Sequence, residues 1–124
     1  MINKIGIMQG RLSKQQGVKI QEFPKDTWEQ EFKKAKDIGF QTIEWIFDSK
    51  DNPIMDDNKL QCIVKKSKEH NITINSIIAD FFMDNLLSSN DSKIGENLET
   101  LKKLTLMVLF VFVGMVNQCS IKNI

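Results

Sequence analysis

Four short apolar runs divide the chain at regular intervals, and an amphipathic stretch follows each of the first three. The runs start at Lys4 (KIGIM), Thr42 (TIEWIF), Thr73 (TINSIIAD) and Val108 (VLFVFVGMV), which lie 38, 31 and 35 residues apart. A strand and its crossover helix need about 30 residues or more, and repetition of that unit makes an α/β protein. The pattern predicts four parallel strands with alternating helices, about half of a closed barrel of eight units, which needs roughly 250 residues.

The first helical stretch carries a start signal and a stop signal. Asp26 is predicted to cap it, and Glu29, three residues later, completes a capping box. Gly39 supplies the left-handed residue that ends a helix. The apolar face is expected to consist of Trp28, Phe32, Ala35 and Ile38.

Two further helices are predicted on the same grounds. The second runs from about Asn58 to His70, with Asn71 as terminator, and buries Leu60, Ile63 and Val64. The third starts near Asp91 and has an apolar stripe of Ile94, Leu98 and Leu101. Almost no connector separates this helix from the fourth apolar run, although a turn back into a parallel strand normally needs a few residues. We therefore expect connecting residues to be missing at this junction.

The segment 104–116 (LTLMVLFVFVGMV) is almost wholly apolar. A membrane-spanning helix needs about 20 apolar residues, more than this run contains. A strand buried on both faces of a parallel sheet also has a continuous apolar sequence. We interpret 104–124 as a divergent fourth strand and tail of a single domain over 1–124, with a membrane anchor through 104–116 as the alternative.

Composition and charge exclude some partners. Hydrophobic residues make up 41% and charged residues 27%, which is ordinary for a globular protein. The net charge of +1 gives no electrostatic basis for binding nucleic acid. Cys62 and Cys119 have no metal-ligand spacing and are expected to be free thiols, which favours a cytoplasmic location. Lys4 interrupts the start of the chain, and no apolar segment typical of a signal peptide follows it.

The longest stretch without helical periodicity lies between the first strand and the first helix, from Met8 to Asp26. Loops of this length in compact domains are usually functional, and in barrels they form the active-site face. Gly10 and Gly17 allow tight turns, and 18–23 is predicted to form a small ribbon. Arg11, just beyond the first strand, could bind a carboxylate or phosphate, or could equally pair with a neighbouring loop acid.

Two carboxylates occupy matching positions in the repeat. Glu44 lies between apolar neighbours inside the second strand, and Asp80 ends the third. A charged group within an apolar strand must be paired or face a polar cavity. Strand-end carboxylates supply proton-transfer groups and metal ligands in barrel enzymes, and the alternative is a structural ion pair at the barrel mouth with Arg11.

Other candidate residues have a structural interpretation beside the functional one. Four aromatic residues could wall a sugar-sized pocket, although aromatic residues beside strands usually belong to the core: Trp45, Phe47, Phe81 and Phe82. His70, the single histidine, lies at a predicted helix C-terminus, where a cation interacts favourably with the helix dipole. That structural role is favoured over catalysis.

Five phrases in fixed order resemble a known family. They are GIMQGRLS, KIQEFP, W-x-x-EF-x-x-A-x-x-IGF, IEWIFDS and NSIIADFFM. Together they resemble the sugar phosphate isomerase/epimerase family with the xylose isomerase-like TIM barrel. The resemblance covers about Ile5 to Lys102 of this chain, which corresponds to the N-terminal half of the family only. The tail resembles the family's fourth strand, but 114–117 (GMVN) stands where a Pro-Phe-Val-Asp-like phrase is expected.

The resemblance implies a partial (β/α)8 TIM barrel and metal-assisted proton transfer next to a carbonyl of a sugar or sugar phosphate. The divalent metal and the catalytic glutamates belong to later strands of the family. This chain is therefore expected to be a truncated copy that holds no metal, has no assignable catalytic residue and is inactive alone. Its substrate-binding residues would be Gln9, Arg11, Glu44, Trp45 and Asp80.

A non-enzymatic role is the alternative. A half-barrel leaves open sheet edges and an uncovered core, which favour self-association or binding of a partner. A membrane-anchored remnant held through 104–116 is a further form of this alternative.

Overall fold

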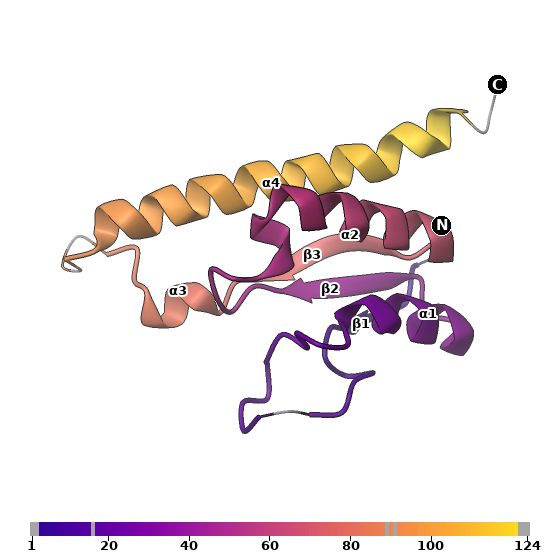
Figure 1. Cartoon of the computed structure of the whole chain (residues 1–124), viewed down its shortest axis with the longest axis horizontal. Helices are drawn as coiled ribbons and strands as arrows, with labels where there is room; N and C mark the ends of the chain where they lie inside the picture. The colour runs from indigo at the N-terminus through magenta and orange to yellow at the C-terminus, as the bar shows by residue number, and fades with distance from the viewer. Residues whose placement is uncertain (1–2, 16, 89, 91, 122–124) are drawn as a thin grey trace.

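The chain folds as an α/β structure in which helices pack beside a small parallel sheet (Figure 1). A computed structural model describes residues 3–15, 17–88, 90 and 92–121, without the side chains of 116–121. Its elements are β1 (Gly6–Met8), α1 (Trp28–Ile38), β2 (Thr42–Ile46), the 3-10 helix η1 (Pro53–Met55), α2 (Asp57–His70), β3 (Thr73–Ile78), α3 (Phe81–Asp84) and α4 (Ile94–Ile121).

The three strands pair in chain order, β1-β2-β3, and both pairs are parallel. This arrangement confirms the first three predicted strands, and a partial barrel is compatible with it. The register pairs Ile7 with Ile43 and Met8 with Glu44, and a bulge in β3 brings Ser76 opposite Glu44. Because side chains alternate along a strand, Met8, Glu44 and Ser76 share one face of the sheet, whereas Ile7, Ile43 and Trp45 share the other.

The predicted fourth strand is wrong, because 104–116 belongs to α4. A largely apolar run of 13 residues exceeds the usual length of a buried strand, and periodicity alone cannot separate such a run from a buried helix. The absence of a connector after the predicted third helix is explained by continuity: one helix runs from Ile94 to Ile121. Among residues with described side chains, no helix has the length and apolar character needed to cross a membrane.

Helix α1 differs from prediction at its start. Its N-cap is Thr27 rather than the predicted Asp26, and the Thr27 side chain makes no capping hydrogen bond. The Thr27 hydroxyl instead donates to the hydroxyl of Ser13, 2.8 Å away. Gly39 ends the helix at φ 104°, as predicted. Trp28, Phe32 and Ala35 are buried, but Ile38 is 62% exposed because the helix ends there, beyond the packed layer.

Helix α2 matches its prediction closely. It ends at His70, and Asn71 follows in the left-handed conformation at φ 53°. The predicted apolar residues Leu60, Ile63 and Val64 are buried.

The predicted stripe at the start of α4 is displaced by one position. Leu98 is 48% exposed, whereas Asn97, Thr100 and Leu104 are buried. The side-chain amide of Asn97 donates to the carbonyl of Leu86, 2.9 Å away. This bond turns the polar residue inward and leaves Leu98 facing solvent.

The core lies between the sheet and the helices. Trp45 is fully buried, and its ring centroid lies 5.3 Å from that of Phe23 and 5.6 Å from that of Trp28. Helices α1, α2 and α4 contact one another in turn, so they cover the sheet face that carries Ile43 and Trp45. Figure 1 shows α4 running along α2 and past β3.

Candidate functional site

The loop after β1 is held by Glu31, a residue of α1 that sequence reasoning missed. The Glu31 carboxylate accepts hydrogen bonds from the backbone N–H groups of Gly10 at 2.9 Å and Leu12 at 3.2 Å, and from the hydroxyl of Ser13 at 3.0 Å. Its side chain is 1% exposed. A signal was present, because Glu31 falls three residues after Trp28 on the apolar face of the helix.

Burial raises the pKa of Glu31 above its ordinary value of 4.5, since desolvation disfavours the charged form. The hydrogen bonds from Gly10, Ser13 and Leu12 oppose that increase without cancelling it. The Glu31 carboxylate is thus fully engaged by groups of the loop after β1. We therefore assign Glu31 a structural role, which is to fix the loop at the carboxyl end of β1.

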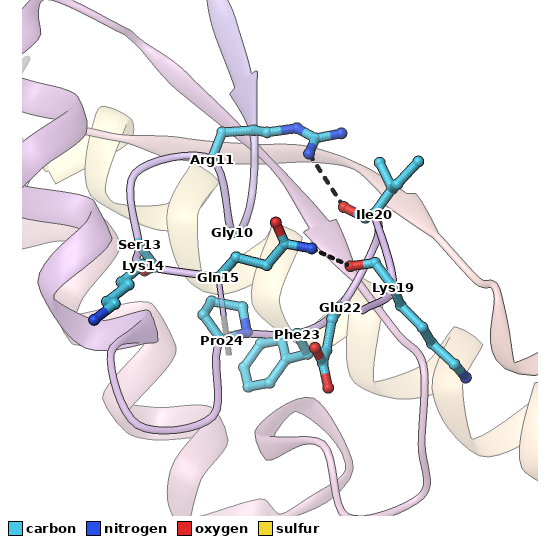
Figure 2. A pocket seen from close by; sticks show the side chains of 10 residues that line it. All are labelled: Gly10, Arg11, Ser13, Lys14, Gln15, Lys19, Ile20, Glu22, Phe23 and Pro24. Carbon is cyan, nitrogen blue, oxygen red and sulfur yellow. Dashed lines mark hydrogen bonds between the residues drawn. The ribbon is translucent and has the colours of Figure 1, made fainter. Parts of the chain in front are cut away.

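Within this loop, a small pocket of about 210 Å³ lies beside Arg11 (Figure 2). The guanidinium of Arg11 donates to the carbonyl of Ile20 at 3.1 Å and contacts the sulfur of Met8 at 3.7 Å. Figure 2 shows the side chains of Lys14 and Lys19 pointing outward in different directions, so the cations do not converge on one anion. The predicted ribbon over 18–23 does not form.

Gln9 joins two strands at the carboxyl end of the sheet. Its backbone N–H donates to the carbonyl of Glu44 at 2.9 Å, and its side-chain oxygen accepts from the N–H of Ile46 at 3.1 Å. The residue is 2% exposed, and its side-chain nitrogen is buried without a hydrogen-bond partner among the described residues. A buried donor of this kind has hydrogen-bonding capacity left for a ligand or water.

Glu44 is half-buried on the sheet face opposite the helices. Its carboxylate accepts a hydrogen bond of 2.7 Å from the hydroxyl of Ser76 on β3. The expected partner Arg11 is wrong, because the guanidinium turns toward the carbonyl of Ile20 instead. Within the described part of the chain, Arg11 makes no ion pair, so pairing with a loop acid is not observed either.

Trp45 lies on the other face, in the core. Its indole N–H donates to the side-chain oxygen of Asn52 at 3.0 Å, and the residue is 0% exposed. The indole therefore has no surface for contact with a ligand in this chain. The remaining aromatic residues of the predicted pocket wall pack on each other, with Phe47 and Phe81 centroids 5.3 Å apart and Phe81 and Phe82 centroids 5.1 Å apart.

A cleft of about 590 Å³ opens where β2 and β3 end. We call it the carboxyl-end cleft; its lining includes Val18, Ile20, Asp48, Asp80, Met83 and Asp84. Asp80 was predicted, but Asp48 was not, although both aspartates stand two residues after the end of their strands. Asp48 accepts a hydrogen bond of 3.0 Å from the N–H of Phe23, and its other oxygen is buried without a partner among the described residues.

The described residues do not fit the divalent metal that the resemblance implies for full-length proteins. No group of three or more histidine, cysteine, aspartate or glutamate side chains among them could hold a metal ion. His70 ends α2, as predicted, just before β3 begins, whereas the carboxyl-end cleft lies where β3 ends. Cys62 is a free thiol, as predicted, and Cys119 lies outside the described side chains.

The predicted site residues thus fall into separate places. Asp80 lines the carboxyl-end cleft, Arg11 lines the pocket of the first loop, and Glu44 lies on the open sheet face. Comparison of the chain with protein-family models, with curated proteins and with solved structures found no match.

Proposed function

We propose that this chain binds a neutral sugar at the carboxyl end of its sheet, as the substrate-contacting half of a sugar isomerase/epimerase barrel, and does not catalyse by itself. The observation that carries the proposal is the carboxyl-end cleft, in which Asp48 and Asp80 project from the ends of adjacent parallel strands. In barrel enzymes this edge of the sheet holds the substrate.

The lining of the cleft suits a polyol. Sugar hydroxyl groups donate hydrogen bonds, and ionised carboxylates accept them more strongly than neutral groups do. Met83 is 73% exposed and Ile20 is 75% exposed, so apolar surface is available to the C–H faces of a sugar ring. Glu44, which lies earlier along β2, offers a further hydrogen-bond acceptor on the open face of the sheet.

The charge of the cleft favours a sugar over a sugar phosphate. Three aspartates, Asp48, Asp80 and Asp84, line it, and Lys19 is the one cation among its described lining residues. A phosphate group would be repelled by this excess of negative charge, because like charges within a few ångströms destabilise each other. The resemblance alone leaves both substrate classes open, and the negative charge of the cleft supports the uncharged one.

Binding of D-fructose and of D-fructose 6-phosphate to the purified chain tests the proposal. We expect a dissociation constant on the order of 1 mM for fructose, which corresponds to about −4 kcal/mol, and weaker binding of the phosphate ester. Neither compound should be turned over. Turnover by the chain alone would contradict the inactive part of the proposal.

Substitutions of two acidic residues test which side chains contribute to fructose binding. Asp80→Asn should weaken fructose binding several-fold, and Glu44→Gln should weaken it without lowering the melting temperature. Glu99→Gln is the matched control, because Glu99 is exposed on α4 outside the cleft. Unchanged binding in Asp80→Asn would reject the cleft as the sugar site. A lower melting temperature in Glu44→Gln would assign Glu44 to structure through its bond to Ser76.

A further inference from the structure

The outer edge of β3 borders an apolar groove. β3 has β2 on one side only, and no strand pairs with its other edge in the described chain. A groove of about 400 Å³ lies between this edge and α4. Its apolar wall includes Ile74, Ile77, Leu104, Val108, Leu109 and Phe112. We call it the β3 groove.

The β3 groove combines two features that an incoming strand requires. The backbone N–H of Ile74 contacts the sulfur of Met115 at 3.5 Å, and a thioether is a weaker acceptor than a peptide carbonyl. Leu109 and Phe112 on the facing helix are 53% and 52% exposed. Strand addition uses backbone hydrogen bonds for affinity and side-chain pockets for specificity.

The same chain carries a strand of matching character at its other edge. Among the described residues β1 has β2 on one side only, and the preceding Ile5 is 64% exposed. Ile5 and Ile7 are two residues apart, so their side chains share a face. Ile7 pairs with the buried Ile43, which places that face on the helix side of the sheet. α4 overhangs β3 on this same side.

We propose that the β3 groove binds β1 of a second copy of this chain, with Ile5 and Ile7 of that copy packing under α4. A two-fold axis parallel to the strands, placed on the side of the open sheet face, preserves strand direction and brings the two sheets edge to edge, so β1 of the partner would run parallel to β3. The same axis places β3 of the partner against β1 of the first copy. The contact is thus reciprocal and closed, and both open edges of the sheet are paired in a dimer.

This inference does not depend on sugar binding, because the linings of the β3 groove and of the carboxyl-end cleft share no residue. Failure of one proposal therefore leaves the other intact.

Sedimentation equilibrium of the purified chain over a range of concentrations tests the dimer. We expect a monomer–dimer equilibrium, which Phe112→Glu and Ile5→Glu should each weaken about tenfold or more, since a buried carboxylate opposes an apolar contact. Ile38→Glu is the matched control, because Ile38 is 62% exposed on α1 outside the groove. Circular dichroism verifies that each variant is folded.

Amide hydrogen exchange of the wild type at low and high concentration supplies a measurement independent of the variants. Backbone amides of β1 and β3 should gain protection as the concentration rises. A chain that stays monomeric, or forms open-ended larger assemblies, overturns the proposal. So does weakening by Phe112→Glu but not by Ile5→Glu, or concentration-dependent protection confined to α4, because both results describe association through the helix alone.

Discussion

Two buried polar side chains, Glu31 and Asn52, hold irregular segments against the regular elements. Asn52 is 1% exposed; its oxygen accepts from the indole of Trp45, and its amide donates to the carbonyl of Ile46 at 2.8 Å. Glu31 performs the same task for the loop after β1. In both cases a buried polar group is stable because backbone or indole groups satisfy it.

Glu31 gives the chain a testable pH dependence. Its pKa is raised by burial above 4.5, so the folded state retains a proton that the unfolded state has lost. The contribution of this group to stability is therefore full below about pH 4.5 and falls as the pH rises through the folded-state pKa. Relative to Glu31→Gln, which cannot titrate, the wild type should lose free energy of unfolding as the pH rises above 4.5.

Urea unfolding of both proteins across this pH range measures the difference. Asp51 titrates in the opposite sense, because its hydrogen bond from Lys25 lowers its pKa from 3.8 to about 2, and its stabilisation is lost as the pH falls toward that value. Asp51 is exposed and present in both proteins, so its effect cancels in the comparison. A wild type that gains stability over the variant as the pH rises would contradict the assignment.

At the scale of single residues, the sequence predicts helix ends better than it predicts hydrogen-bond partners. Gly39 and Asn71 were identifiable because few residue types tolerate the left-handed conformation that ends a helix. The bond from Ser76 to Glu44 was not identifiable, since it depends on a bulge that shifts β3 by one residue. Hydrogen-bond partners follow from strand register, which a single sequence does not fix.

Helix α4 is the element that departs most from its prediction. Its apolar second half follows directly on an amphipathic first half, and both are one helix. Length was the informative signal, because a largely apolar run of 13 residues suits a helix better than a strand. The three strands were predicted correctly because each is short, apolar and preceded or followed by a clear helix boundary.

Two glycines of α4 test its packing. Gly95 has open space around it, whereas a side chain at Gly114 would approach the methyl groups of Val64 on α2 at 3.2 and 3.3 Å. Gly95→Ala should raise the free energy of unfolding by about 0.5–1 kcal/mol through the backbone preference for alanine. Gly114→Ala has the same preference but crowds Val64, so its gain should be smaller or negative.

Thermal unfolding of the two alanine variants against the wild type measures this difference. An equal gain at both positions would show that α4 does not pack on α2 at Gly114. That result would also argue against the β3 groove, because the same helix forms one wall of the groove.

The whole molecule is an open sheet with one face covered by helices and the other carrying Met8, Glu44 and Ser76. The strand order and direction were predictable from the repeat, because consecutive parallel strands joined by helices pair in sequence. The location of the carboxyl-end cleft followed from the same rule, although Asp48 and the loop residues that line it did not. Their placement depends on how the long first loop folds, and no periodic pattern in the sequence predicts the conformation of that loop.

Amide chemical-shift mapping of the labelled chain titrated with D-fructose tests the sugar-binding account most directly. The account predicts the largest shifts at the backbone amides of Asp48, Asp80 and Met83, around the carboxyl-end cleft. A larger hollow of about 870 Å³ between α1 and α2, lined by Glu29, Lys66 and other charged residues, should show none. Shifts confined to that hollow, or no shifts at saturating sugar, would contradict the account.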